Sequence, residues 1–396
     1  MKCPSLRIAV PVSLMLAAAL LPQQSAFAVT YEVLHHFGSV ANDGAIPRGS
    51  LVQDRFGSLY GTTATGGTAS KGILFRLAGS RYTILRHFAG NPLARDGEGP
   101  SGNLVSDNLG NVYGTTEGGS DPNTFGSVFK WDVAKGFSTF YRFSFTDGWL
   151  PRGLTRDADG NLYGVTALGG DPARSPGFGT IYKISPTGRF TKLFSFNGTN
   201  GASSVAPLLR VGNVLYGTTV TGGSVSGNVF KINTDGTGFT VLQDSFPFGW
   251  GFSGGLTKHP LNSNLYGAAG RGGTPNTGGI YKVTAAGAYS FEYQFTGPNG
   301  AYPQGTLISD GQGNFYGTTH GNESGCVNGS GAGGYGTVFQ YVPTATPTLT
   351  TLHPFHGTDG ANPCLSELLR DASGNLYGVT QYGGTFNKGV LFRIRP

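Results

Sequence analysis

Chemistry-bearing residues gather in one kind of loop that recurs along the chain. The loop runs from Asp or Asn through Gly to Pro, with copies at residues 43–47, 96–100, 147–151, 299–303 and 359–363. Trp149 and Trp250 fall at similar places in it, and Tyr302 is nearby. An aromatic ring can stack on sugar C–H groups while carboxylates and amides bond the hydroxyls. We therefore predict a ligand site on one face, formed by Asp43, Asp96, Asp147, Trp149, Trp250, Asn299, Tyr302 and Asp359.

A purely structural interpretation of this loop stays open. Asp and Gly are favoured turn residues, and a Trp can pack beneath a loop instead of contacting a ligand. If the loops emerge at one end of the molecule, the Asp and Asn side chains would line one end of a central channel.

Catalytic and metal-binding patterns are missing from the sequence. Its histidines show neither an HExxH pair nor a Cys–His zinc spacing. Residues 157–161 resemble part of a calcium loop, but the remaining ligands do not follow. We predict no catalytic residue, no metal and no cofactor, and we expect a binding protein rather than an enzyme. An active site assembled from single residues of several repeats remains open.

The elements that would position these residues belong to a repeat of about 50 residues. A Tyr-Gly pair marks each copy, and successive pairs are 53, 50, 53, 50, 50 and 61 residues apart. The pairs begin at Tyr60, Tyr113, Tyr163, Tyr216, Tyr266, Tyr316 and Tyr377. A period of this size is typical of propellers, solenoids and arrays.

Each repeat contains four strand-like runs separated by Gly-rich turns, and no sustained helical periodicity is present. Four antiparallel strands form a propeller blade, so the chain is predicted to be an all-β, seven-bladed β-propeller. The run from Thr30 to Phe37 resembles a fourth strand, whereas the chain closes with a third strand over Gly389 to Ile394. We expect the N-terminal strand to complete the last blade and close the ring.

Two features of the repeat are predicted to be structural. The seven Tyr residues are expected to pack between neighbouring blades, and the Gly after each Tyr to let an adjacent sheet approach. Strand three carries a cation after its aromatic residue in six copies, and these cations are expected either to be solvated or to serve contacts between blades, with positive charge spread around the ring. Nucleic acid binding needs a concentrated patch and is therefore not expected.

The Asn-Leu-Tyr-Gly-Thr-Thr strand, the Gly-Gly loop and the Gly-Thr-Val-Phe-Lys strand resemble the GloVer (Gloeo-Verruco) tandem repeat of choice-of-anchor secreted bacterial proteins. The resemblance covers nearly all of the chain after residue 28. It implies export and a propeller-like repeat domain, and it implies no particular activity. Members often carry a C-terminal surface anchor, whereas this chain ends inside a strand at Pro396.

Export is also indicated by the N-terminus. Lys2 and Arg7 precede an apolar run, and Ala26-Phe27-Ala28 fits a cleavage site. We predict a signal peptide at residues 1–28 and one propeller domain at residues 29–396, located outside the cytoplasm. Removal of Lys2 and Arg7 reduces the formal charge from +6 to +4.

Two cysteines remain after cleavage, and an exported protein favours a disulfide between Cys326 and Cys364. Two free thiols are the alternative. The expected mature chain has no transmembrane segment and is a monomer.

Three functions are compatible with these observations. The first is a non-catalytic binding module for glycans or cell-envelope partners. The others are a polysaccharide-active hydrolase or lyase and a protein–protein scaffold. The fold alone does not separate them.

Overall fold

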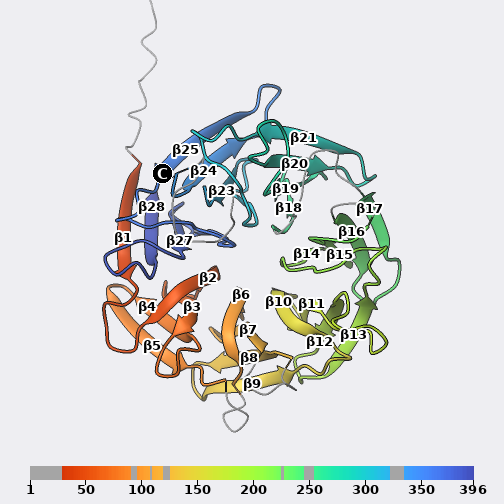
Figure 1. The fold of residues 1–396 in the computed structure, drawn as a ribbon, viewed down its shortest axis with the longest axis horizontal. Coiled ribbons are helices and arrows are strands. Elements are labelled where there is room, and N and C mark those ends of the chain that lie inside the picture. The colour runs from red at the N-terminus through yellow and green to blue at the C-terminus, as the bar shows by residue number, and fades with distance from the viewer. Residues whose placement is uncertain are drawn as a thin grey trace, which may run out of the picture.

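The computed structural model describes residues 29–90, 96–107, 109–118, 125–223, 227–244, 254–321 and 334–396. These residues form seven four-stranded antiparallel sheets arranged as blades around a ring (Figure 1). The predicted seven-bladed, all-β propeller is confirmed. In the same parts of the chain, no helix has the length and apolar character needed to cross a membrane.

The blades follow one another in chain order, each with its first strand innermost. Blade 1 contains β2 (Gly44–Gln53), β3 (Leu59–Gly66), β4 (Ile73–Ala78) and β5 (Arg81–His87). Blade 2 contains β6 (Glu98–Ser106), β7 (Val112–Gly118), β8 (Ser127–Asp132) and β9 (Gly136–Arg142). Blade 3 contains β10 (Trp149–Arg156), β11 (Leu162–Leu168), β12 (Thr180–Ile184) and β13 (Phe190–Ser195). Blade 4 contains β14 (Leu209–Val211), β15 (Val214–Thr218), β16 (Asn228–Asn233) and β17 (Thr240–Asp244).

The remaining blades have shorter inner strands. Blade 5 contains β18 (Thr257–Lys258), β19 (Leu265–Ala269), β20 (Gly279–Val283) and β21 (Tyr289–Gln294). Blade 6 contains β22 (Ile308–Ser309), β23 (Phe315–Thr319), β24 (Thr337–Val342) and β25 (Thr348–Pro354). Blade 7 contains β26 (Leu369–Arg370), β27 (Leu376–Thr380) and β28 (Val390–Arg395), and its outer strand is β1 (Thr30–His36).

The ring closes as the sequence predicts. Strand β1 pairs antiparallel with β28, from Thr30 opposite Arg395 to His36 opposite Val390. Glu32 on β1 forms ion pairs with Arg393 at 2.5 Å and Arg395 at 3.1 Å. The closing blade is thus built from both ends of the described chain, which lie side by side in Figure 1.

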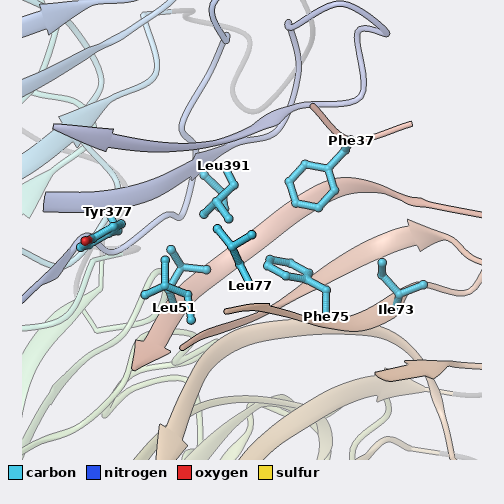
Figure 2. Close-up of a cluster of buried hydrophobic side chains, with 9 residues drawn as sticks. Phe37, Leu51, Ile73, Phe75, Leu77, Tyr377 and Leu391 are labelled. Atoms are coloured by element: carbon cyan, nitrogen blue, oxygen red, sulfur yellow. The ribbon is translucent and has the colours of Figure 1, made fainter. Parts of the chain in front are cut away.

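The hydrophobic core lies between neighbouring blades. Tyr377 of blade 7 packs in one cluster with Leu51 and Leu59 of blade 1, and Figure 2 shows part of this cluster. Tyr163 packs in the same way against Leu208 of blade 4. The prediction that the repeat tyrosines pack between blades is confirmed.

Cations on the third strand lie beside these tyrosines. Their charged groups stand 5.5–5.8 Å from the ring centroids, within range of a cation–π interaction. The pairs are Arg76 with Tyr60, Lys130 with Tyr113, and Lys183 with Tyr163. The repeated positive charge therefore has a packing role.

The Gly after each Tyr has a different role from the one predicted. A Cβ atom on Gly61 would stand 2.4 Å from the ring of Phe75 and 2.7 Å from Leu51. Both residues belong to the same blade as Gly61, not to the adjacent sheet. Gly61 faces Phe75 across the β3–β4 pair, so the missing side chain leaves room for the aromatic ring of its own blade.

Candidate functional site

One end of the ring carries two sets of loops, and we call it the Asp-loop face. It holds the Asp/Asn-Gly loops between blades and the loops that join the second and third strands within a blade. Strand pairing brings the two sets together, since Gly44 lies opposite Gly66 and Trp149 lies opposite Leu168. The long loops of the repeat therefore share one surface.

Asp43 shows what the first residue of the Asp loop does. Its carboxylate accepts hydrogen bonds from the backbone N–H groups of Gly38 and Gly44 at 2.7 and 2.8 Å. It also bonds His35 Nε2 at 2.9 Å and the Tyr82 hydroxyl at 2.7 Å. His35 lies on β1 and Tyr82 on β5, so this single side chain joins the outer strands of two blades.

The other predicted Asp and Asn residues repeat this arrangement. Asp96 is fully buried and pairs with Arg86 at 2.7 Å. The remaining contacts of this type are Asp147 with the Tyr141 hydroxyl, Asn299 with the Tyr293 hydroxyl, and Asp359 with His353 Nε2. Each partner lies on the outer strand of a blade.

The expectation that these residues line the central channel is therefore wrong. Each loop starts beside the outer strand, where its backbone N–H groups and an outer side chain bond the carboxylate or amide. A small cavity of about 50 Å³ lies at the axis of the ring, and none of Asp43, Asp96, Asp147, Asn299 and Asp359 is among its lining residues. Their contact with a ligand stays a prediction.

Electrostatics stabilise two of these carboxylates, Asp43 and Asp359, as anions. Burial alone would raise the pKa of Asp43, but hydrogen bonds from His35 and Tyr82 outweigh it and hold the pKa below its ordinary value. Asp359 behaves alike, because bonds from His353 and the His356 amide offset burial and lower its pKa. Both carboxylates are therefore ionised at neutral pH, where their hydrogen bonds stabilise the folded ring.

The Asp-loop face also concentrates backbone strain. The residue before the loop Pro has a positive φ, a conformation that costs energy in residues with side chains. Examples are Ile46 at 55°, Leu150 at 57°, Tyr302 at 59° and Asn362 at 52°. The strain recurs at one loop position around the ring, and Leu150 lines the pocket described next.

The candidate binding site is a pocket of about 790 Å³ on this face, which we call the Trp149 pocket. Blades 1, 2 and 3 all contribute to it. Its principal side chains are Lys71, Glu98, Glu117, Phe125, Phe145 and Trp149. Its volume lies in the range typical of small-molecule sites.

Three aromatic rings form one part of the Trp149 pocket. The Phe125 ring meets Trp149 edge-to-face with centroids 6.2 Å apart, and it meets Phe145 at 5.6 Å in the same geometry. Trp149 is half-buried, so part of its surface faces the pocket. Edge-to-face packing fixes the rings in place and prepares an apolar platform.

Lys71, Glu98 and Glu117 form the polar part of the pocket, and two ion pairs hold them in place. Lys71 Nζ lies 2.5 Å from Glu98 Oε2, and Arg152 lies 2.8 Å from Glu117 Oε1. Each pair joins neighbouring blades, since Lys71 belongs to blade 1, Glu98 and Glu117 to blade 2, and Arg152 to blade 3. The pocket thus combines aromatic surface with donors and acceptors for hydroxyl groups.

A small cavity of about 50 Å³ lies between the inner strands, and we call it the central cavity. Arg48, Arg152, Gln304 and Glu367 are among its lining residues. It is narrow because the inner strands touch through glycine: a Cβ on Gly49 would stand 1.9 Å from a backbone oxygen. Burial raises the pKa of Glu367 to about 7.

The other predicted site residues have varied positions. Tyr302 is 5% exposed and stacks on His320 with ring centroids 5.6 Å apart. Burial, and then the charge of Arg271, lower the pKa of His320 to about 4.

Trp250 lies outside the described residues, as do Cys326 and the predicted signal peptide. In the described part of the chain, no three His, Cys, Asp or Glu residues are placed to hold a metal ion.

Cys364 is buried and disulfide-bonded, and its Sγ lies 3.2 Å from Gln304 Oε1. Its pairing with Cys326 stays a prediction.

Sequence reasoning identified Trp149 but missed its neighbours in the pocket. Glu98 stands in the same loop slot as Trp149, and Glu117 stands where other repeats carry Ala64 or Ala167. Comparing each loop position across the repeats would have singled out these departures. Phe125 and Phe145 carry no such signal, because only the fold brings them to Trp149.

A closed ring of seven four-stranded blades, with its pocket formed by loops of one face, defines a β-propeller with a loop-face site. The chain belongs to the Gloeobacter/Verrucomicrobia repeat family, whose model matches residues 79–251 and 249–396. No curated protein matches the chain.

Solved structures share the fold at low sequence identity. Oligogalacturonate lyase from Vibrio parahaemolyticus is 11% identical, with a TM-score of 0.57 over 93% of this chain and 96% of that one. PorZ, a surface component of the type-IX secretion system of Porphyromonas gingivalis, is 16% identical, with a TM-score of 0.53 over 90% of this chain and 47% of that one. At such identities the likeness shows the propeller fold alone.

Proposed function

We propose that this protein is an exported, non-catalytic binding module for glycans, with its principal site in the Trp149 pocket. The observation that carries the proposal is the packing of Phe125, Phe145 and Trp149 beside two ion pairs in one open pocket. A sugar presents apolar C–H faces and polar hydroxyl edges, so this combination suits both. The pocket is also large enough for a ligand of that size.

The rigidity of the pocket supports a binding role. Its side chains are held by edge-to-face ring contacts and by salt bridges between blades. A site that is already organised loses less conformational entropy when a ligand binds. Export rests on the N-terminal residues 1–28, whose charge, apolar run and small residues resemble a signal peptide.

A polysaccharide hydrolase or lyase is the second candidate, because Glu98 and Glu117 both line the pocket. A hydrolase of the usual type needs one carboxyl group that keeps its proton as a general acid. Lys71 and Arg152 each form an ion pair with one of these carboxylates, so both carboxylates are already engaged in contacts between blades. The arrangement therefore fits hydroxyl recognition better than acid catalysis.

The first experiment is a glycan-array screen, followed by calorimetry on the glycan that gives the strongest signal. We expect Trp149→Ala to weaken binding by at least about tenfold, because it removes a stacking surface worth about 1.4 kcal/mol or more. Phe386→Ala is the matched control, since Phe386 is an exposed aromatic in the β27–β28 loop of the same face, on blade 7. Equal binding by Trp149→Ala and the unsubstituted protein would place the site elsewhere.

The enzymatic alternative has its own test on the same glycans. Release of reducing ends or unsaturated sugars by the unsubstituted protein, abolished by Glu98→Gln or Glu117→Gln, would establish catalysis. Binding without product release supports the module.

A further inference from the structure

The blades that form the Trp149 pocket share a second feature at their inner edge. Directly after the loop Pro, before a Gly, blades 1, 2 and 3 carry Arg48, Ser101 and Arg152. Arg48 and Arg152 both line the central cavity. The repeat thus places two guanidinium groups near the axis of the ring, on the side of the molecule where the pocket lies.

The two arginines differ in their partners. Arg152 forms an ion pair with Glu117 at 2.8 Å, and Glu117 itself lines the Trp149 pocket. Arg48 has no ion pair or hydrogen bond within the described part of the chain, and the Nε atoms of both arginines are buried without a partner. Ser101 likewise keeps a buried hydroxyl that bonds nothing described. Partly buried guanidinium groups are normally paired, so an unpaired one indicates a site for an anion.

The charges around the pocket and the central cavity also single out Arg48. Lys71 is neutralised by Glu98 and Arg152 by Glu117, which leaves the charge of Arg48 uncompensated. Burial is the largest cause of the lowered pKa of the Arg152 guanidinium, and Glu117 opposes it. The nearby charge of Arg48 lowers this pKa further, which shows that the two arginines are close to each other. Glu367 lines the same cavity but forms no ion pair with Arg48 within the described part of the chain. It also lines a second pocket, together with Leu154, Leu208 and Leu307.

The size of the cavity restricts what can reach Arg48. About 50 Å³ admits a small group but not a sugar ring, and the contact between Gly49 and Gly102 keeps it narrow. Along β2, Arg48 lies three residues from Ala45, which is opposite Thr65 of the Trp149 pocket. At the rise of an extended strand this separation is roughly 10 Å. A ring held in the pocket could therefore direct a substituent toward the axis.

We propose that Arg48 binds an anionic substituent of the glycan in the Trp149 pocket, so that the preferred ligand is an acidic glycan. This inference rests on the proposed function and names its ligand class. The planar guanidinium donates a fork of N–H groups that matches a carboxylate, a sulfate or a phosphate ester. Arg152 lines the same cavity, and Ser101 occupies the same repeat position in blade 2.

The test compares uronic acid oligomers with their fully methyl-esterified counterparts, which have the same ring shape without the charge. We expect the intact protein to bind the acid at least about tenfold more tightly than the ester, corresponding to about 1.4 kcal/mol. Arg48→Gln should reduce acid binding to the level of the ester and leave ester binding unchanged. Arg48→Lys should retain part of the preference, because it keeps the charge but loses the fork.

Arg55→Gln is the matched control, since Arg55 is an exposed arginine in the turn between β2 and β3. It should leave both affinities unchanged, which separates a local site from the effect of overall charge. A sulfated oligomer is titrated in parallel with the uronic acid oligomer. The tighter binder of the two shows whether Arg48 prefers a sulfate or a carboxylate.

The outcomes separate this inference from the proposed function. Equal affinity for acid and ester, with both lost in Trp149→Ala, overturns the role of Arg48 and retains the glycan site. An acid preference that survives Arg48→Gln also overturns it. If no glycan of either kind binds, both proposals fail.

Discussion

Asp43 illustrates how a single carboxylate can organise a junction between blades. It is 6% exposed and accepts bonds from two backbone amides and from side chains on β1 and β5. Beside it, the rings of His35 and Tyr82 stack with centroids 3.6 Å apart. The side chain thus contributes to ring closure, because β1 completes the last blade.

We expect Asp43→Asn to destabilise the protein by about 1–3 kcal/mol, because an amide cannot accept all of these bonds. The folded-state pKa of Asp43 lies below the ordinary value of 3.8, so its contribution is present above the unfolded-state pKa. That contribution is lost as pH falls from about 4 through the folded-state pKa. The free energy of unfolding, measured by urea titration at several pH values, should therefore be lower for the variant at pH 7. It should also fall less steeply for the variant than for the unsubstituted protein as the pH drops below about 4.

Asp159→Asn is the matched control, since Asp159 is exposed in the β10–β11 turn. It should change neither stability nor its pH dependence. A similar loss in both variants would contradict the assigned role of Asp43.

At the scale of the element, the second strand of each blade combines Tyr and Gly for different reasons. The Tyr ring packs toward the neighbouring blade, whereas the Gly faces an aromatic residue of its own third strand. The same close approach recurs at Gly114 with Phe129 and at Gly217 with Phe230. A side chain at the Gly position would have to displace a buried ring.

Gly61→Ala should accordingly destabilise the protein by about 1–3 kcal/mol through overpacking against Phe75. Adding Phe75→Leu to this variant should recover part of the loss, because the smaller side chain vacates the space that the new methyl group needs. Denaturant unfolding of the two single variants and the double variant measures this coupling. Strict additivity of the two losses would contradict the contact.

For the whole molecule, closure of the ring depends on a strand from the opposite end of the chain. Strand β1 covers the edge of β28 and adds Tyr31 and Val33 to the packing of blade 7. An uncovered strand edge is prone to pair with other molecules.

Deleting residues 29–37 should lower the thermal midpoint by several degrees and produce oligomers in size-exclusion chromatography, because the β28 edge becomes free. Glu32→Gln is the matched control: it removes the surface ion pairs with Arg393 and Arg395 but keeps the strand. Such pairs contribute little, so this variant should unfold nearly as the unsubstituted protein does. An unchanged midpoint after the deletion would show that the ring does not need β1.

The predicted disulfide is a covalent cross-link within the propeller, in addition to the strand pairing that closes the ring. Cys364 is bonded, and Cys326 is the only other cysteine beyond the predicted signal peptide. We expect non-reducing peptide mapping to recover a linked pair containing both residues. Alkylation of Cys326 without reduction would rule out the pairing.

The sequence alone determined the architecture of this protein. A Tyr-Gly strand at near-constant spacing, turn residues between short strands, and a strand-four motif at the N-terminus were sufficient for seven blades and their closure. Repeats make this inference possible because each blade contacts mainly its neighbours, so local patterns recur with the same physical role.

The tertiary structure decided where chemistry can occur. The repeated Asp and Asn residues were expected at the channel, but they bond outer strands, because hydrogen bonds to nearby amides and outer-strand side chains satisfy them first. The Trp149 pocket instead joins Lys71 of blade 1, Glu117 of blade 2 and Phe145 of the loop between blades 2 and 3. Residues so far apart in sequence meet only through the curvature of the ring, and no local spacing encodes that curvature.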